Sequence, residues 1–114
     1  MRRLGWQVET DPFDAKTPNF GTLRFENIIA KVNPSASKIL VLACHYDSKY
    51  YRDVEFLGAT DSAVPCAMLI NLAHSFANEL PALKKSVSSF RIIVHIFNYT
   101  FAIFFSIKKN VSFF

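Results

Sequence analysis

A continuous apolar run from Ile39 to Cys44 constrains the fold of this chain more than any other segment. An apolar run without alternation is typical of a strand that is covered on both faces, and therefore of an interior, parallel strand. The run ends in two polar residues, His45 and Asp47. Open α/β sheets bind their ligands beyond the carboxyl ends of the strands, so we expect a functional site at this end.

A helix is predicted over residues 61–80, after a charged and tyrosine-rich loop. Asp61 or Ser62 can serve as its N-cap, a proline is tolerated in its first turn, and Pro81 is predicted to end it. Apolar residues recur at helical spacing, which indicates a stripe that packs in the core. The residues expected in the core are Met68, Leu69, Leu72, Phe76 and Leu80.

Three further strands complete the predicted secondary structure. Two of them, at residues 6–9 and 23–32, are separated by a segment with two prolines and a glycine, which predicts a long loop. A linker over residues 82–89 leads to a buried strand of β-branched and aromatic residues at 90–97. Together these elements predict an α/β fold, a partial open mixed sheet of mostly parallel strands with a flanking helix.

Composition limits the classes of function. The net charge of +4 comes from scattered lysines and arginines, without a basic block interleaved with aromatic residues, so nucleic-acid binding is not expected. The first residues lack the apolar core of a signal peptide. The phenylalanine-rich stretch at residues 92–107 is short for a membrane span of about 20 residues and contains polar side chains, so membrane association is the less favoured interpretation.

The polar residues at the strand end have the pattern of half a metal site. His45 and Asp47 are two residues apart, so on an extended strand they point the same way, and with Asp61 they could converge on one cation. A structural interpretation competes, because polar residues at strand ends and aspartates at helix starts are ordinary caps. Spacing alone leaves both interpretations open.

Four segments together identify a family. The segments "GWQVETDPF", "NIIAKVNPSASK", "LVLACHYDSKYY" and "FLGATDSAVPCAML" resemble the glutaminyl-peptide cyclotransferases, or glutaminyl cyclases, over residues 4–83. These are zinc enzymes with the fold of zinc-dependent aminopeptidases. The resemblance implies one zinc ion, peptide or protein substrates with an N-terminal glutamine, release of ammonia as pyroglutamate forms, and a place in the secretory pathway.

The resemblance also implies roles for individual residues. Asp61 matches a zinc ligand of the family, and His45 matches a residue that lies near the metal without binding it. Asp47 would either orient His45 or lie outside the metal ligands and hold them in place without binding the metal. The family pairs the cysteines that match Cys44 and Cys66, although two buried free thiols remain an alternative.

The resemblance stops before the family's catalytic acid. There, an apolar strand ends in Asp-Gly-Glu-Glu, in which the first glutamate is the general acid/base and the second a zinc ligand. In this chain Thr100 and Phe101 stand at those positions, so no general acid/base is predicted. We therefore expect residues 1–85 to be the N-terminal part of a cyclase-like catalytic domain and residues 86–114 to be a divergent, Phe-rich tail.

This division leads to the expectation that the chain is a truncated form, weak in zinc retention and inactive alone. Two alternatives stay open at this point. One is a zinc aminopeptidase of the same fold, and the other is a non-catalytic truncated product that associates with peptides or a membrane.

Overall fold

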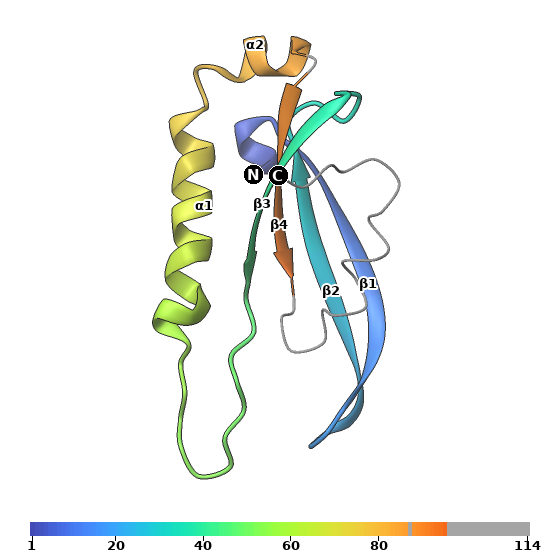
Figure 1. Cartoon of the computed structure of the whole chain (residues 1–114), viewed down its shortest axis with the longest axis vertical. Helices are drawn as coiled ribbons and strands as arrows, with labels where there is room; N and C mark the ends of the chain where they lie inside the picture. Colours follow the sequence, from blue (N-terminus) through green and yellow to red (C-terminus); the bar gives the residue numbers. More distant parts are fainter. Residues whose placement is uncertain (87, 96–114) are drawn as a thin grey trace.

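The computed structural model describes residues 1–86 and 88–95, which form a sheet with one long helix along it (Figure 1). Among these residues the sheet has four strands in the order β1-β2-β4-β3. The strands are β1 (Gln7–Thr17), β2 (Gly21–Lys31), β3 (Lys38–His45) and β4 (Ser88–His95). The helical elements are η1 (Arg2–Leu4), η2 (Ala59–Ala63), α1 (Val64–Ser75) and α2 (Leu80–Lys85).

The sheet is mixed, as expected. β1 pairs with β2 and β2 with β4 in antiparallel fashion, whereas β3 and β4 are parallel. Parallel neighbours need a crossover, and α1 and α2 supply it between β3 and β4. The α/β class is therefore confirmed, but parallel pairing does not dominate the described strands, because the N-terminal hairpin adds two antiparallel pairings.

The long loop predicted between the first two strands is wrong. β1 and β2 form a hairpin that pairs continuously from Gln7 with Lys31 to Thr17 with Gly21. β1 lies at the end of the described sheet, where a proline can be accommodated without the loss of a ladder hydrogen bond. The turn is closed by the Thr17 hydroxyl, which accepts the Phe20 N–H at 2.9 Å.

The apolar run forms β3, and the parallel pairing expected of it is found with β4. The expectation of an interior strand covered on both faces is not met in the described part of the chain. There β3 has only β4 beside it, α1 packs along it, and Leu40 is 53% exposed. A run of apolar residues indicates a hydrophobic strand, but it does not show how many strands lie beside it.

Helix α1 is shorter at both ends than predicted. Asp61 and Ser62 have non-helical backbone angles, so regular helix begins at Val64. It ends at Ser75, well before Pro81, which instead lies in the first turn of α2. A proline in that position starts a helix because its missing N–H has no partner there anyway. Half of the predicted linker over residues 82–89 is therefore helical.

The core lies between α1 and the sheet. Its buried residues are Trp6, Ala30, Val32, Ala73, Leu80 and Ile92. Leu69 packs against this cluster, and the Phe76 ring stacks on Phe90 of β4 with centroids 5.3 Å apart. The prediction for Met68 is wrong, because that side chain is 66% exposed. Met68 precedes Leu69 by one residue and so faces about 100° away from it around the helix.

The C-terminal part of the sequence is described as far as β4, which covers most of the strand predicted at residues 90–97. Thr100, Phe101 and the rest of the Phe-rich segment lie outside the described residues. Within residues 1–86 and 88–95, no helix has the length and apolar character of a membrane span. The division of the chain at residue 85 stays a prediction.

Candidate functional site

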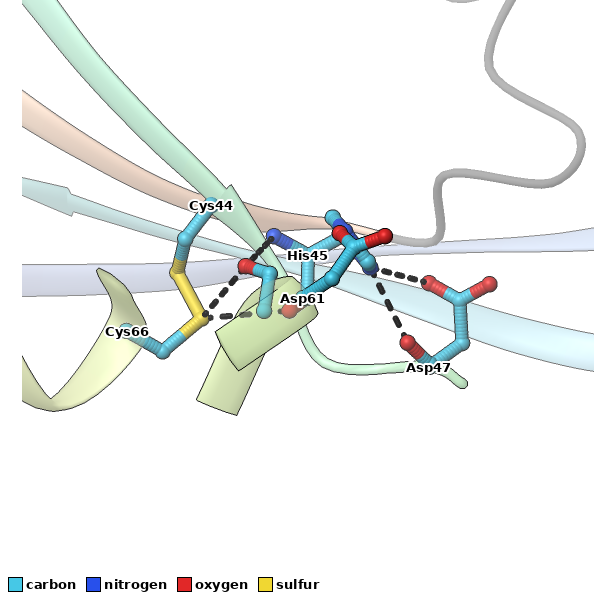
Figure 2. The surroundings of a disulfide bond; sticks show 6 residues. Cys44, His45, Asp47, Asp61 and Cys66 are labelled. Carbon is cyan, nitrogen blue, oxygen red and sulfur yellow. Dashed lines mark hydrogen bonds and ion pairs between the residues drawn. A yellow bond between two sulfur atoms is a disulfide. The ribbon is translucent and has the colours of Figure 1, made fainter. Parts of the chain in front are cut away.

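The site lies where β3 ends and the polypeptide returns to start α1. His45 is the last residue of β3, Asp47 follows it in a loop, and Asp61 belongs to the turn η2 before the helix. Figure 2 shows His45 between the two aspartates, with Asp47 on one side of the imidazole and Asp61 on the other. The three residues singled out from the sequence are thus brought together.

Both ring nitrogens of His45 face oxygen atoms. Nδ1 lies 2.9 Å from the main-chain carbonyl oxygen of Asp47 and 3.4 Å from a carboxylate oxygen of the same residue. Nε2 lies 2.7 Å from Oδ1 of Asp61. A carbonyl oxygen only accepts, so Nδ1 carries a proton and donates it. A second proton must lie between Nε2 and Asp61 for that contact to be attractive.

This environment changes the proton affinity of His45. Burial lowers the pKa of the imidazole, but it is outweighed by hydrogen bonds to the Asp61 carboxylate and the Asp47 carbonyl and by the charges of both aspartates. The pKa of His45 therefore lies above its ordinary value of 6.5. The arrangement favours an imidazolium that bridges the two aspartates, with the Asp61 side chain 76% exposed to solvent.

Gly58 makes the approach of Asp61 possible. Its backbone is left-handed, with φ of 63°, and its carbonyl accepts the Ala63 N–H at 3.0 Å to close the turn. A Cβ atom at this position would lie 2.7 Å from the Asp61 carbonyl oxygen and 3.1 Å from Cβ of Ser48. We did not predict this role, although a glycine three residues before a polar helix start is a usable signal.

Ser62 ties the same turn to β3. Its side chain is buried, and its Oγ accepts the backbone N–H of His45 at 3.3 Å. Its hydroxyl also lies 3.9 Å from Sγ of Cys66, and the peptide bond between Asp61 and Ser62 is cis. The sequence suggested only a helix cap for Ser62, whereas the structure places it as a tether between the turn and the strand end.

A disulfide joins Cys44 of β3 to Cys66 in the first turn of α1, the pairing that the resemblance implied. The bond closes a separation of 22 residues, and Figure 2 shows it to the left of His45 and Asp61. It holds together the two elements that carry the site. The disulfide therefore holds the end of β3 and the start of α1 together covalently, independently of the hydrogen bonds of His45.

The described residues do not make a complete metal centre. Catalytic zinc takes about three protein ligands and keeps one position open. Across residues 1–86 and 88–95, no group of three His, Cys, Asp or Glu side chains converges as a metal site. Asp61 offers one exposed carboxylate, and His45 already donates to Asp47 through Nδ1. The predicted role of Asp61 as a zinc ligand stays a prediction.

Comparison with known proteins places this geometry in a family. Residues 27–98, which include β3, the site loop and α1, match the model of Peptidase family M28. This chain belongs to the M28 family. The M28 chain is 56% identical over 93 residues to a glutaminyl-peptide cyclotransferase of Drosophila melanogaster, a match that covers 82% of the chain and 26% of that relative.

Solved structures of glutaminyl cyclases are also similar to this chain. Glutaminyl cyclase from Macrostomum lignano superposes with a TM-score of 0.70 at 38% identity, over 83% of this M28 chain and 27% of that protein. A Zn-dependent exopeptidase from Parabacteroides distasonis, at 24% identity and a TM-score of 0.67, shares the fold over 82% of the chain and 33% of its own length. The resemblance to the glutaminyl cyclases is therefore confirmed. The chain spans about a quarter of the length of the curated cyclotransferase that it matches.

Proposed function

We propose that this M28 chain forms the part of a zinc-dependent glutaminyl-peptide cyclotransferase that lies beside the metal ion. The reaction of that enzyme would join the α-amine of an N-terminal glutamine to its own side-chain amide carbon, so that a five-membered lactam forms and ammonia leaves. Because the ring closure is intramolecular, positioning of the substrate would supply much of the rate. Substrates would be peptides or proteins that begin with glutamine.

One observation carries the proposal. Asp61 is held at the carboxyl end of β3, 2.7 Å from His45, in a segment that shares 56% identity with a named cyclotransferase. The exposed Asp61 carboxylate is the group that we assign to zinc, and His45 would lie beside the ion with Asp47 behind it. A cation at Asp61 would compete with the proton that the two side chains now share.

The described residues fit zinc only in part, since they offer fewer than the three ligands that catalysis needs. We therefore propose that the 114-residue chain alone binds zinc weakly and does not close glutamine rings. Its own residues would contribute the orientation of Asp61, through Gly58 and Ser62, and the imidazole of His45 beside it. No carboxylate follows Glu79 in the sequence to act as the acid/base.

The disulfide favours an oxidising compartment. Disulfides persist in secreted proteins and in the secretory pathway, whereas cytosolic thiols are kept reduced. Because Cys44 and Cys66 are the two cysteines of the chain and pair with each other, we propose that the protein acts in the secretory pathway. Non-reducing peptide mapping of the native protein that finds both thiols free would contradict this location.

A chimaera tests the proposed function. The segment of the Drosophila melanogaster cyclotransferase that matches this chain would be replaced by the corresponding residues of this chain. We expect the chimaera to bind zinc and to convert a glutamine-initiated peptide to its pyroglutamyl form with equimolar ammonia. The matched control carries Asp61→Asn, which removes the negative charge at constant size and should abolish both zinc retention and turnover.

The same assay separates the related activity of the fold. An aminopeptidase would release free glutamine from the peptide, and no pyroglutamate would form. A folded chimaera that binds zinc but releases free amino acid, or that keeps its cyclase activity with Asp61→Asn, would disprove the proposal. The isolated 114-residue chain should show neither product, and stoichiometric zinc after dialysis would contradict the ligand count.

A further inference from the structure

The loop between β3 and η2, residues 46–58, contains no helix or strand, yet it carries Asp47. Its first residue, Tyr46, follows His45 directly. Tyr46 is 50% exposed as a residue, but its hydroxyl donates a hydrogen bond of 2.7 Å to the carbonyl oxygen of Glu26. Because Tyr46 is half-exposed, it contributes little to the core. Its short hydrogen bond to the main chain therefore serves mainly to attach the loop to β2.

This hydrogen bond joins strands that are not neighbours. Glu26 lies in β2, and β4 separates β2 from β3 in the sheet. The described pairing of β2 with β4 runs from Lys31 only as far as Ile28, so the Glu26 carbonyl lies beyond it. Tyr46 therefore reaches from the end of β3 to a part of the hairpin that lies beyond the described pairing of β2 with β4.

A second contact supports the same loop from the same hairpin. The ring of Phe20, at the turn between β1 and β2, meets the ring of Tyr50 edge to face with centroids 4.9 Å apart. Such aromatic pairs contribute beyond their buried area. The loop is thus attached to the N-terminal hairpin at two points, of which the Tyr46 hydrogen bond lies one residue from Asp47.

We propose that Tyr46 is a positioning residue of the site, which holds the Asp47 carbonyl where it accepts the Nδ1 proton of His45. With Nδ1 fixed in this way, Nε2 points at Asp61. The inference rests on the proposed function only in taking His45 and Asp61 as the site. In this proposal β2 fixes Tyr46, Tyr46 fixes the neighbouring Asp47, and the Asp47 carbonyl fixes the orientation of the imidazole.

The test uses the full 114-residue chain and two matched substitutions. Tyr46→Phe removes the tethering hydroxyl and keeps the ring. Tyr51→Phe makes the same change in the same loop, where the ring packs on Phe56 and under Lys49 and its hydroxyl has no partner among the described residues. At one fixed, mildly acidic pH, NMR would follow the exchange with water of the Nδ1 and Nε2 protons of His45.

We expect Tyr46→Phe to speed exchange of the Nδ1 proton by about two- to tenfold, the range set by one net hydrogen bond. Exchange of the Nε2 proton should change less, because the Asp61 contact remains. Tyr51→Phe should match the wild type. Placing 4-aminophenylalanine at position 46 restores an N–H donor and should restore slow Nδ1 exchange, which a general loosening of the loop would not allow.

Equal exchange in the wild type and in Tyr46→Phe would overturn the proposal, as would equal acceleration in both tyrosine variants. Backbone amide spectra that match elsewhere in the chain would show that each variant keeps the fold. Because the measurement needs neither zinc nor turnover, its failure is distinct from failure of the proposed function. That function could be disproved by the chimaera while Tyr46 still positions His45.

Discussion

Nε2 of His45 lies 2.7 Å from Oδ1 of Asp61, across the gap between the end of β3 and the turn before α1. Since Nδ1 of the same ring donates to the Asp47 carbonyl, a second proton must lie between Nε2 and Asp61, and the raised pKa of His45 favours its place on the imidazole. The site described by these contacts is therefore a charged bridge whose strength depends on pH. A cation that binds Asp61 would have to displace a proton to do so.

The first prediction concerns this bridge. Asp61→Asn should lower the pKa of His45, because the hydrogen bond to the carboxylate is the largest of the effects that raise it. A group whose pKa is raised on folding stabilises the fold below its unfolded pKa and loses that contribution as pH rises through its folded pKa. The variant should therefore lose stability at about pH 5.5 and much less at about pH 9.

The loss should be below about 1 kcal/mol, since the Asp61 side chain is 76% exposed and solvent screens the pair. NMR titration of His45 and urea unfolding at both pH values measure the two effects. Asp53→Asn is the matched control, because it makes the same change in the loop before η2 without a described contact to His45. An unchanged pKa of His45 in Asp61→Asn would contradict the bridge.

The second prediction tests the turn that presents Asp61. Gly58→Ala places a methyl group 2.7 Å from the Asp61 carbonyl oxygen, so the turn has to move. Gly21→Ala is a close control, because Gly21 also has positive φ, 69°, but no atom lies within 4 Å of the added Cβ. Both variants incur left-handed strain of about 1 to 2 kcal/mol. Gly58→Ala should lose at least about 1 kcal/mol more, in the range of overpacked sites.

Thermal or urea unfolding of the two glycine variants would measure that difference, and His45 spectra would report the displacement of Asp61. Equal losses of stability in both variants, with His45 unperturbed, would show that the space around Gly58 does not matter.

The third prediction concerns the disulfide. Replacing Cys44 and Cys66 together by serine removes a link across 22 residues, which in the chain-entropy model is worth about 3 kcal/mol. The free energy of unfolding in urea should fall by about that amount. A reducing agent should destabilise the wild type similarly and leave the double variant unchanged, and any effect of the agent on the double variant would point to another cause.

The fourth prediction tests the orientation of α1. Ala73 is fully buried at 0% exposure, so Ala73→Leu adds volume to a filled core and should destabilise the chain by about 1 to 3 kcal/mol. Met68→Gln changes an exposed side chain and should stay within about 0.5 kcal/mol of the wild type. The reverse order of effects in urea unfolding would mean that the helix packs on its other face.

Sequence patterns predicted the elements around the site because local signals there agree. The apolar run gave the position of β3, and the polar residues at its end, His45 and Asp47, lie where the pattern indicated. The helix start was misplaced because Asp61 and Ser62 look like caps, whereas their backbone angles are set by tertiary contacts to His45 and to Gly58. Propensity describes a residue in isolation and does not contain such contacts.

The N-terminal hairpin was missed for a related reason. Pro12 and Pro18 are strong loop signals, but only Pro18 lies in the turn, whereas Pro12 lies in β1 at the end of the described sheet, where a proline can be accommodated. Glu26 falls within the strand predicted at residues 23–32, but the sequence did not show that this strand reaches the loop after β3. The contact of the Tyr46 hydroxyl with the Glu26 carbonyl could therefore not be anticipated.

The bond between Cys44 and Cys66 turns the segment between them into a closed ring. A protease that cut within it, for example beside the highly exposed Leu57, would open the ring without dividing the protein into two molecules. Both halves of the site would stay attached at their bases.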